Sequence, residues 1–161
     1  MEKVVAEEAW HSHWEFVPQA PRRLAAGLPM MPDLILRDGQ SDKAVGDAKY
    51  KELNGKRPPP EDLYQLLAYC VSLGLPSGLL IYADERPPGE PYVVERAGVI
   101  LEVEGIDLTG DPADVLARAR KCARKLIQQA ERACAGEGMR LGSLKAKYLE
   151  EYGELRAERQ G

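Results

Sequence analysis

Two extended segments separated by a polar turn constrain the fold of this chain more than any other feature. Residues 31–37 and 43–51 are the two segments, and the "DGQSD" stretch between them supplies a glycine and side chains that favour turns. An antiparallel hairpin centred on Gln40 places Asp33 directly opposite Asp47. Directly opposed residues share one face of a sheet, with Cβ atoms about 4.5 to 5.5 Å apart. The sequence therefore predicts two adjacent carboxylates.

The two faces of this hairpin differ in chemistry. Lys49 lies two residues beyond Asp47, so its side chain projects from the same face as the two aspartates. The opposite face can pack under the helix predicted at residues 61–73, and it carries Leu34, Leu36, Ala44, Gly46, Ala48 and Tyr50. Opposed carboxylates destabilise a sheet unless a cation compensates them, and oxygen ligands suit Mg²⁺ or Mn²⁺ rather than zinc.

A divalent metal beside Lys49 would suit chemistry on an anion. The metal would polarise a phosphoryl oxygen and lower the pKa of a bound water, while the ammonium would steady the developing charge. The alternative is that these charges are solvated on an exposed sheet face, which is common in antiparallel hairpins.

A strong helix is predicted at residues 61–73, between the prolines of "KRPPPED" and a glycine at position 74. Its expected core stripe consists of Leu63, Leu66, Leu67, Cys70 and Val71. Gln65 and Tyr69 lie four residues apart and project from one side of the helix, next to that stripe. An amide and a phenol there could hold a nucleic-acid phosphate or base, although a packed tyrosine and a solvated glutamine are the simpler interpretation.

The remaining segments predict a single α/β or α+β domain. Residues 1–10 predict a short helix, "WEFVPQ" a strand, and "PRR" at position 21 a turn. The apolar run "GLLIYA" predicts a central strand covered on both faces, and further strands are expected near 92–96 and 98–108.

A long helix is predicted at residues 112–134. We expect its inward side to carry Val115, Ala119, Cys122, Leu126 and Ala130, and its outward side a basic row of Arg118, Lys121, Lys125 and Arg132. Residues 143–160 carry a stripe of Leu144, Tyr148, Tyr152 and Leu155 on a charged background. That segment could dock on the core, bind a partner or fray.

Composition excludes several classes of protein. With 161 residues, of which 44% are hydrophobic, the chain can bury one core. No apolar run is long enough to cross a membrane, and the acidic N-terminus is unlike a signal peptide, so we expect a cytoplasmic protein. The three cysteines form no CxxC pair and are expected to be buried free thiols. The net charge of −4 gives no global attraction to nucleic acid.

The motifs occur in an order that resembles the PD-(D/E)xK nuclease superfamily. Pro32-Asp33 matches its PD, Asp47-Ala48-Lys49 its D-x-K, and the segment from Gln65 to Tyr69 the QxxxY helix of its RecB-like branch. The likeness spans roughly residues 14–130 and is greatest to the C-terminal nuclease domain of the McrC family, in the McrBC modification-dependent restriction system. It implies a restriction-endonuclease-like mixed central sheet flanked by helices. It also implies a nuclease-like domain at 1–135, with a linker and a charged amphipathic helix at 136–161.

The resemblance assigns roles to particular residues. Asp33, Asp47 and the Ala48 carbonyl would hold Mg²⁺, with Mn²⁺ able to substitute, and Lys49 would be catalytic together with the two aspartates. Gln65, Tyr69 and Lys51 would support the site or the DNA strand. The reaction would be metal-assisted hydrolysis of DNA phosphodiesters by an in-line water.

Further candidates lie near the N-terminus. The family often has an acid on its first helix, a place that Glu7 or Glu8 could fill, and related exonucleases can use an upstream histidine such as His11 or His13. A solvated helix face and packing histidines are the alternatives.

The expected partners are DNA and a separate DNA-recognition or NTPase subunit; a homodimer is an alternative, and no membrane contact is expected. Lys43, Lys49, Lys51, Lys56 and Arg57 could meet DNA phosphates, but the sequence contains no base-reading motif. In the McrC family an N-terminal region docks onto a GTPase, and only about one helix precedes the likeness here, which leaves that partnership open.

The first functional hypothesis is therefore a Mg²⁺-dependent DNA endonuclease of a restriction or defence system. The alternatives are a catalytically silent domain of the same fold that binds DNA or a protein, and a repair or recombination exonuclease of the RecB-like branch. An unrelated protein with a chance match would keep Asp33 and Asp47 far apart.

Overall fold

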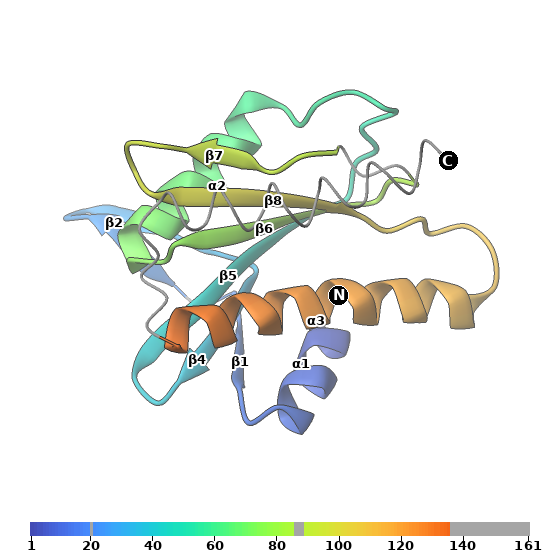
Figure 1. Cartoon of the computed structure of the whole chain (residues 1–161), viewed down its shortest axis with the longest axis horizontal. Helices are drawn as coiled ribbons and strands as arrows, with labels where there is room; N and C mark the ends of the chain where they lie inside the picture. Colours follow the sequence, from blue (N-terminus) through green and yellow to red (C-terminus); the bar gives the residue numbers. More distant parts are fainter. Residues whose placement is uncertain (20, 86–88, 136–161) are drawn as a thin grey trace.

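A computed structural model of the chain describes residues 1–19, 21–85 and 89–135. Within them, a six-stranded mixed sheet lies between helices on its two faces (Figure 1). In spatial order the strands are β1 (Glu15–Pro18), β4 (Leu34–Asp38), β5 (Ser41–Lys49), β6 (Ser77–Tyr82), β8 (Val99–Gly105) and β7 (Tyr92–Val94). The expected mixed sheet flanked by helices is confirmed. None of the helices in these residues is long and apolar enough to cross a membrane.

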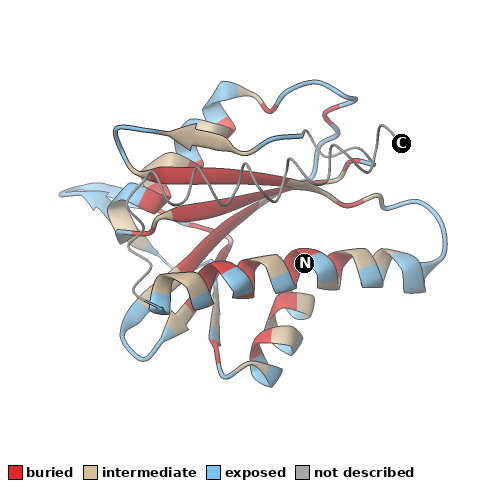
Figure 2. Cartoon of the chain, in the orientation of Figure 1, coloured by how far each residue is buried: buried red, intermediate tan, exposed pale blue. Residues whose placement is uncertain are grey.

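Different helices cover the two faces of the sheet. Helix α2 (Pro60–Leu73) packs on one face, against Ile35, Val45 and Leu80. Helices α1 (Glu2–His11) and α3 (Pro112–Cys134) pack on the other, against Leu34 and Leu36. The strands between them are buried on both sides, most completely in β6, as Figure 2 shows. The prediction of a two-sided central strand in "GLLIYA" is thus confirmed.

The order of strands explains where functional side chains can gather. Strands β5, β6 and β8 are parallel neighbours, whereas β4 and β7 run antiparallel to the strands beside them. Parallel neighbours bring their carboxyl ends to the same edge of the sheet. The last residues of β5, Asp47 to Lys49, therefore lie beside Leu80 to Tyr82 at the end of β6.

The hairpin of β4 and β5 has the expected register next to the two aspartates. Leu34 pairs with Gly46 and Ile35 with Val45, which extends to Asp33 opposite Asp47. The register shifts between Leu36 and Arg37, so the strands continue closer to the turn than predicted and leave only two residues between them. A φ of 57° at Gly39 makes this tight turn possible.

One face of this hairpin packs differently from the prediction. The apolar face that includes Leu34 and Ala44 was expected under the helix of residues 61–73, but it packs against α1 and α3. Helix α2 covers the aspartate face instead, where Ile35 and Val45 supply apolar area. The alternation of side chains defines the two faces but does not determine which helix covers each.

Residues 22–30 form a second hairpin where only a turn was expected. Its strands are β2 (Arg22–Ala25) and β3 (Leu28–Met30), and Gly27 at a φ of 74° lies in its turn. Arg22 binds both carboxylate oxygens of Asp42 on β5, at 2.7 and 2.9 Å, which ties the small hairpin to the main sheet. Short and largely exposed strands of this kind lack a clear pattern of alternating hydrophobicity.

The predicted bounds of the helices are correct to within a residue, but the predicted burial is wrong for some of their residues. Val71 is 57% exposed although it was expected in the core stripe, and Tyr69 is buried in its place. Cys70 and Cys122 are buried free thiols as expected, whereas Cys134 is exposed. The expected stripe of residues 143–160 and the domain boundary near 136 lie outside the described residues.

Helix α2 packs closely against Gly78 of β6. A Cβ atom at this position would lie 2.6 Å from the Cys70 sulfur and 2.9 Å from a Leu66 methyl. We predict that Gly78→Ala lowers the free energy of unfolding by about 1–3 kcal/mol, because the helix has to move away. Urea denaturation measures this change. Gly89→Ala, where the new methyl meets nothing within 4 Å, is the control and is expected to leave stability nearly unchanged.

Candidate functional site

Asp47 is the most deeply buried charged residue of the site. It lies near the end of β5 on the face covered by α2 and is only 3% exposed. Its Oδ2 atom lies 2.5 Å from Lys49 Nζ, yet it is buried without an aligned hydrogen bond. Burial raises the pKa of Asp47, and nearby Asp33 raises it further, against the lowering effect of Lys49. The alternative of solvated charges on an exposed sheet face is therefore wrong for Asp47.

Asp33 precedes β4 and adjoins the end of β5. Its Oδ2 atom accepts a hydrogen bond of 3.1 Å from the Ala48 backbone N–H. Its charge and a hydrogen bond both act on the Asp47 carboxylate, so the two side chains lie together as the hairpin geometry predicts. A chance match that keeps the two aspartates apart is excluded.

Lys49 joins the two aspartates to α2. Its ammonium lies 2.5 Å from Asp47 Oδ2 and 2.7 Å from Gln65 Oε1. A lysine at this position belongs to the same face as Asp47 by strand alternation, and the first turns of α2 bring Gln65 over it. Four polar side chains from three segments of the chain, Asp33, Asp47, Lys49 and Gln65, thus form one cluster.

Tyr69 lies one helical turn beyond Gln65 and is buried at 4% exposure. Its hydroxyl donates to the Met31 carbonyl at 3.5 Å, just before Asp33. Burial first, and then the charges of Asp47 and Asp33, raise the pKa of Tyr69 to about 12. The phenol therefore stays protonated at neutral pH and remains a hydrogen-bond donor next to the two carboxylates.

Asp62 is a member of the site that the sequence interpretation missed. It lies in the first turn of α2 and is 6% exposed. Its Oδ2 atom binds Lys51 Nζ at 2.7 Å and the Tyr82 hydroxyl at 2.6 Å. Acids in the first turn of a helix usually face water and are favoured there by the helix dipole, so the sequence pattern does not single out this residue. Lys51, expected to contact DNA, is engaged by Asp62.

The surroundings of Asp62 favour its charged form, whereas those of Asp47 disfavour it. Burial acts to raise the pKa of Asp62, but the hydrogen bonds from Lys51 and Tyr82 and the charges of the two lysines outweigh it and lower the pKa. The Tyr82 hydroxyl has a raised pKa because of burial and its bond to Asp62, so it is the donor of that bond.

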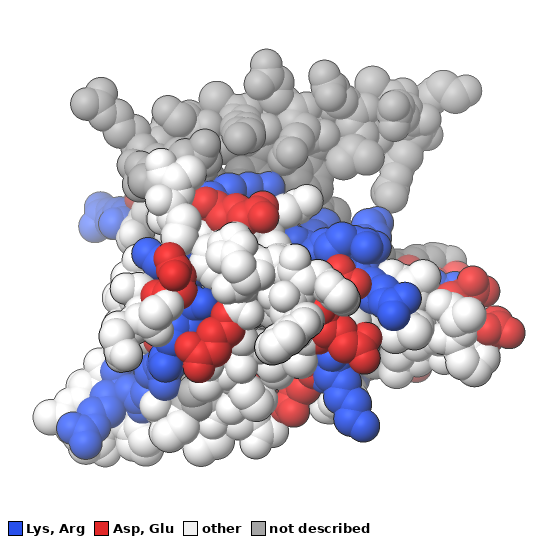
Figure 3. All heavy atoms as spheres, turned by 90° about the horizontal axis from the view of Figure 1, so that it is seen from below, with Lys and Arg blue, Asp and Glu red and all other residues white. Residues whose placement is uncertain are grey.

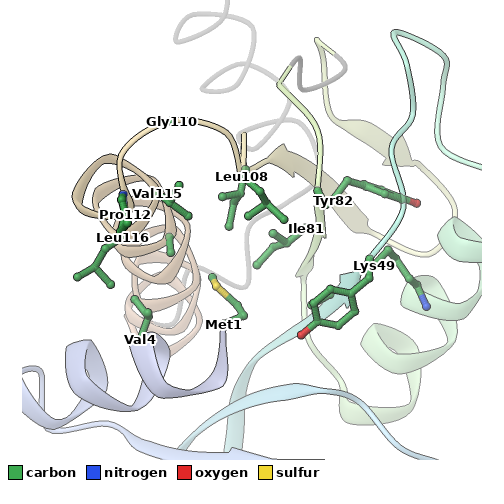
Figure 4. Close-up of a pocket in the computed structure, with 15 residues that line it drawn as sticks. Met1, Val4, Lys49, Ile81, Tyr82, Leu108, Gly110, Pro112, Val115 and Leu116 are labelled. Carbon is green, nitrogen blue, oxygen red and sulfur yellow. The ribbon is translucent and has the colours of Figure 1, made fainter.

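A large apolar pocket lies on the opposite face from these polar groups. Its volume is about 510 Å³, and it is lined by residues of α1, α3 and the strand ends, including Met1, Val4, Leu108 and Val115. Figure 4 shows the Lys49 and Tyr82 side chains pointing away from this apolar lining. The pocket therefore lies at the same edge of the sheet as the polar cluster, but its lining is mainly apolar.

The tentative N-terminal candidates lie away from the cluster. Glu7 and Glu8 form ion pairs with Arg120 of α3, and Glu8 also pairs with Arg124, all on the face opposite α2. Acidic and basic side chains are intermingled where the molecule is seen from below (Figure 3). Pairing with α3 accounts for both glutamates without a role in the cluster.

The two histidines adjoin the end of β1 that lies away from Asp33. His11 ends α1, and His13 is exposed and stacks against Trp14 with ring centroids 4.8 Å apart. Strand β1 begins next to them at Glu15, which pairs with Arg37, whereas its other end pairs with Leu34 beside Asp33. The structure does not bring either histidine to the aspartates.

The basic row of α3 is not a free surface. Arg118 binds Asp107, Lys125 binds Glu104, and Arg132 binds Glu102. The expectation that all of these side chains point outward is wrong, because β8 presents two glutamates to the helix. Only Lys121 of the row is fully exposed.

The residues present suit a hard divalent cation better than a soft one. Asp33 and Asp47 offer carboxylate oxygens, and Asp47 Oδ2 is buried without an aligned hydrogen bond. No third His, Cys, Asp or Glu joins them among the described residues. A cation here would complete its coordination with the Ala48 carbonyl and water, which is typical of Mg²⁺.

Comparisons with known proteins relate nearly half of the chain to one family. Residues 9–83 match the family model of the McrBC 5-methylcytosine restriction system component, a segment that contains Asp33, Asp47, Lys49 and Gln65. This match confirms the resemblance to the McrBC family. No curated protein matches the chain.

A solved structure supports the fold of this McrBC-like chain. It is the refined half-complex from a tetradecameric assembly of Thermococcus gammatolerans McrB AAA+ hexamers with bound McrC. The likeness has a TM-score of 0.53 at 19% identity and covers 74% of this chain. This chain spans only 30% of the chain that it matches. The likeness therefore shows a shared fold.

Two aspartates of β5 are expected to affect stability in opposite directions. The Asp42 pKa is lowered, because its bonds to Arg22 and Arg37 outweigh burial, so Asp42 stabilises the fold above its ordinary pKa of 3.8. The Asp47 pKa is raised, so folding loses stability as the pH rises from 3.8 through that pKa. We predict that at pH 7 without metal Asp42→Asn costs about 1 kcal/mol and Asp47→Asn is stabilising.

Urea denaturation between pH 3 and pH 7 measures both changes. The two differences from the wild type should shrink toward the acid end, where both carboxyls become protonated in the folded and unfolded states. Destabilisation by Asp47→Asn equal to that by Asp42→Asn at pH 7 would contradict the assignment.

Proposed function

We propose that the chain is a metal-dependent deoxyribonuclease and the nuclease component of a McrBC-type restriction system. One observation carries the proposal: the Asp47 carboxylate is buried beside Asp33, with the Lys49 ammonium 2.5 Å away. A buried and incompletely satisfied carboxylate is costly for a structural role, and such sites are typical of function. The match to the McrBC family model supports the choice of reaction and system.

The proposed roles follow from the contacts of each side chain. Asp33, Asp47 and the Ala48 carbonyl would hold Mg²⁺ or Mn²⁺, which when bound polarises a phosphoryl oxygen and lowers the pKa of bound water. Lys49 supplies a positive charge for the developing negative charge on the phosphate. Gln65 orients that ammonium through its 2.7 Å contact. Tyr69 holds the segment before Asp33 through the Met31 carbonyl.

The surroundings offer limited contact with DNA. Lys56 and Arg57 are exposed on the loop between β5 and α2, close in sequence to the site, and could meet phosphates. The expected basic row of α3 is largely paired with acids. We propose that a separate subunit supplies recognition of the DNA and an NTPase motor, as the McrB AAA+ hexamers in the Thermococcus gammatolerans assembly suggest.

Cleavage of supercoiled plasmid tests the proposed reaction. We predict nicking by the wild type with Mg²⁺ or Mn²⁺, loss of nicking on addition of EDTA, and a rate at least about 100-fold lower for Asp47→Ala and Lys49→Ala. Asp38→Asn changes an exposed acid at the other end of the same hairpin and is the control, expected to nick at the wild-type rate. Equal nicking by the wild type and Asp47→Ala would refute the proposal.

The contribution of Gln65 can be separated from stability. Gln65 is exposed, so Gln65→Ala should leave the unfolding free energy within about 0.5 kcal/mol of the wild type. We predict that nicking slows about tenfold, because Lys49 loses an acceptor that fixes its ammonium. Gln128→Ala on the exposed side of α3 is the matched control. An unchanged rate for Gln65→Ala would remove Gln65 from the site.

A further inference from the structure

Asp62, in the first turn of α2, links that helix to β6 and to the segment that follows β5. The helix supplies Asp62 itself, β6 supplies the Tyr82 hydroxyl at 2.6 Å, and the segment after β5 supplies Lys51 Nζ at 2.7 Å. Both of these groups bind Oδ2, while Oδ1 lies 4.0 Å from Lys49 Nζ. A buried carboxylate held by two donors on one oxygen has a fixed orientation. Its second oxygen is therefore held in place toward Lys49.

The Lys49 ammonium lies between two carboxylates. Asp47 is in contact with it at 2.5 Å, and Asp62 is within 4.0 Å on the side of α2. Gln65 contacts the same ammonium at 2.7 Å and belongs to the same helix as Asp62. A rotation of the lysine side chain can exchange Asp47 for Asp62 as its main acceptor, because the two distances, 2.5 and 4.0 Å, differ by only 1.5 Å.

Metal binding at Asp47 would compete with Lys49. A cation at Asp47 Oδ2 takes the same oxygen that the ammonium contacts, and two positive charges in one place repel each other. Lys49 is half-buried, and the Gln65 amide oxygen that remains in contact with it carries no charge, so loss of its carboxylate partner is costly. The site therefore needs a second carboxylate for Lys49 if metal and lysine are to be present together.

We propose that Asp62 is a positioning residue that accepts the Lys49 ammonium when a divalent cation occupies Asp47. This inference rests on the proposed function, because it requires a cation at Asp47. Asp62 acts through Lys49, and its other contacts are with Lys51 and Tyr82. It makes metal binding compatible with a charged lysine in the site.

Calorimetric titration with Mn²⁺ in the absence of DNA tests this role in a double-mutant cycle. Asp62→Asn keeps the size and an oxygen for Tyr82 but removes the charge, so Mn²⁺ has to displace Lys49 with no second carboxylate available. The expected result is binding about tenfold weaker than that of the wild type. With Lys49→Met in the background, Asp62→Asn should change the dissociation constant less than twofold. Equal weakening in both backgrounds would overturn the proposal.

Two controls separate this coupling from a general effect of charge or folding. Glu61→Gln removes an exposed acid from the same turn of α2 and is expected to leave Mn²⁺ binding unchanged. If Asp62→Asn does not fold, Lys51→Met replaces it and should tighten Mn²⁺ binding about threefold, because Asp62 then has one cation fewer to neutralise it. Lys121→Met on the exposed side of α3 is the matched control. Tightening by Lys51→Met that persists in Lys49→Met would also overturn the proposal.

The same titrations distinguish this inference from the proposed function. Absence of Mn²⁺ binding to the wild type, or equal binding to Asp47→Ala, would refute the metal site and the role of Asp62 with it. Binding that Asp47→Ala abolishes and that Asp62→Asn leaves unchanged would refute the role of Asp62 alone.

Discussion

Parallel pairing of β5 with β6 and of β6 with β8 is the constraint on which the rest of this structure depends. Parallel strands need long crossover connections, which here run through α2 between β5 and β6 and through β7 between β6 and β8. With α2 on one face of the sheet and α1 and α3 on the other, the middle of β5 is covered on both sides. Asp47 is therefore buried whatever its chemistry, and the costs of burial have to be met locally. Lys49 meets part of that cost, but the oxygen that it contacts, Oδ2, lacks an aligned hydrogen bond, and the adjacent Asp33 adds to the cost.

Two buried aspartates of the site, Asp47 on β5 and Asp62 on α2, have pKa values shifted in opposite directions. Asp62 has a lowered pKa, because Lys51 and Tyr82 bind one of its oxygens. Asp47 has a raised pKa, because burial and the adjacent Asp33 outweigh Lys49. A cation would relieve the second carboxylate far more than the first. Environments that push the pKa values of two acids apart are typical of sites in which the acids have different tasks.

The sequence was sufficient for the features that depend on local geometry. Strand alternation placed Asp33, Asp47 and Lys49 on one face, and the register around Leu34 and Gly46 agrees with it. The bounds of α3 and the glycine that ends α2 also followed from periodicity and capping signals.

Features that depend on long-range packing were not accessible from the sequence. The pattern of the hairpin could not say which helix covers the aspartates, because that depends on the path of each connection. The partners of Lys125 and Arg132 come from β8, so a solvated basic row and a paired one look alike in sequence. Asp62 could not be recognised from the sequence, because its contacts with Lys51 and Tyr82 join segments far apart in the chain.

The central claim is that Asp33 and Asp47 share one divalent cation beside Lys49. Titration of the chain with Mn²⁺, followed by the electron paramagnetic resonance signal of the free ion, tests it directly. The account predicts one site per chain in the wild type, and loss of that site in Asp33→Asn with the fold intact by circular dichroism. Binding of Mn²⁺ to Asp33→Asn with the same stoichiometry and affinity as to the wild type would contradict it.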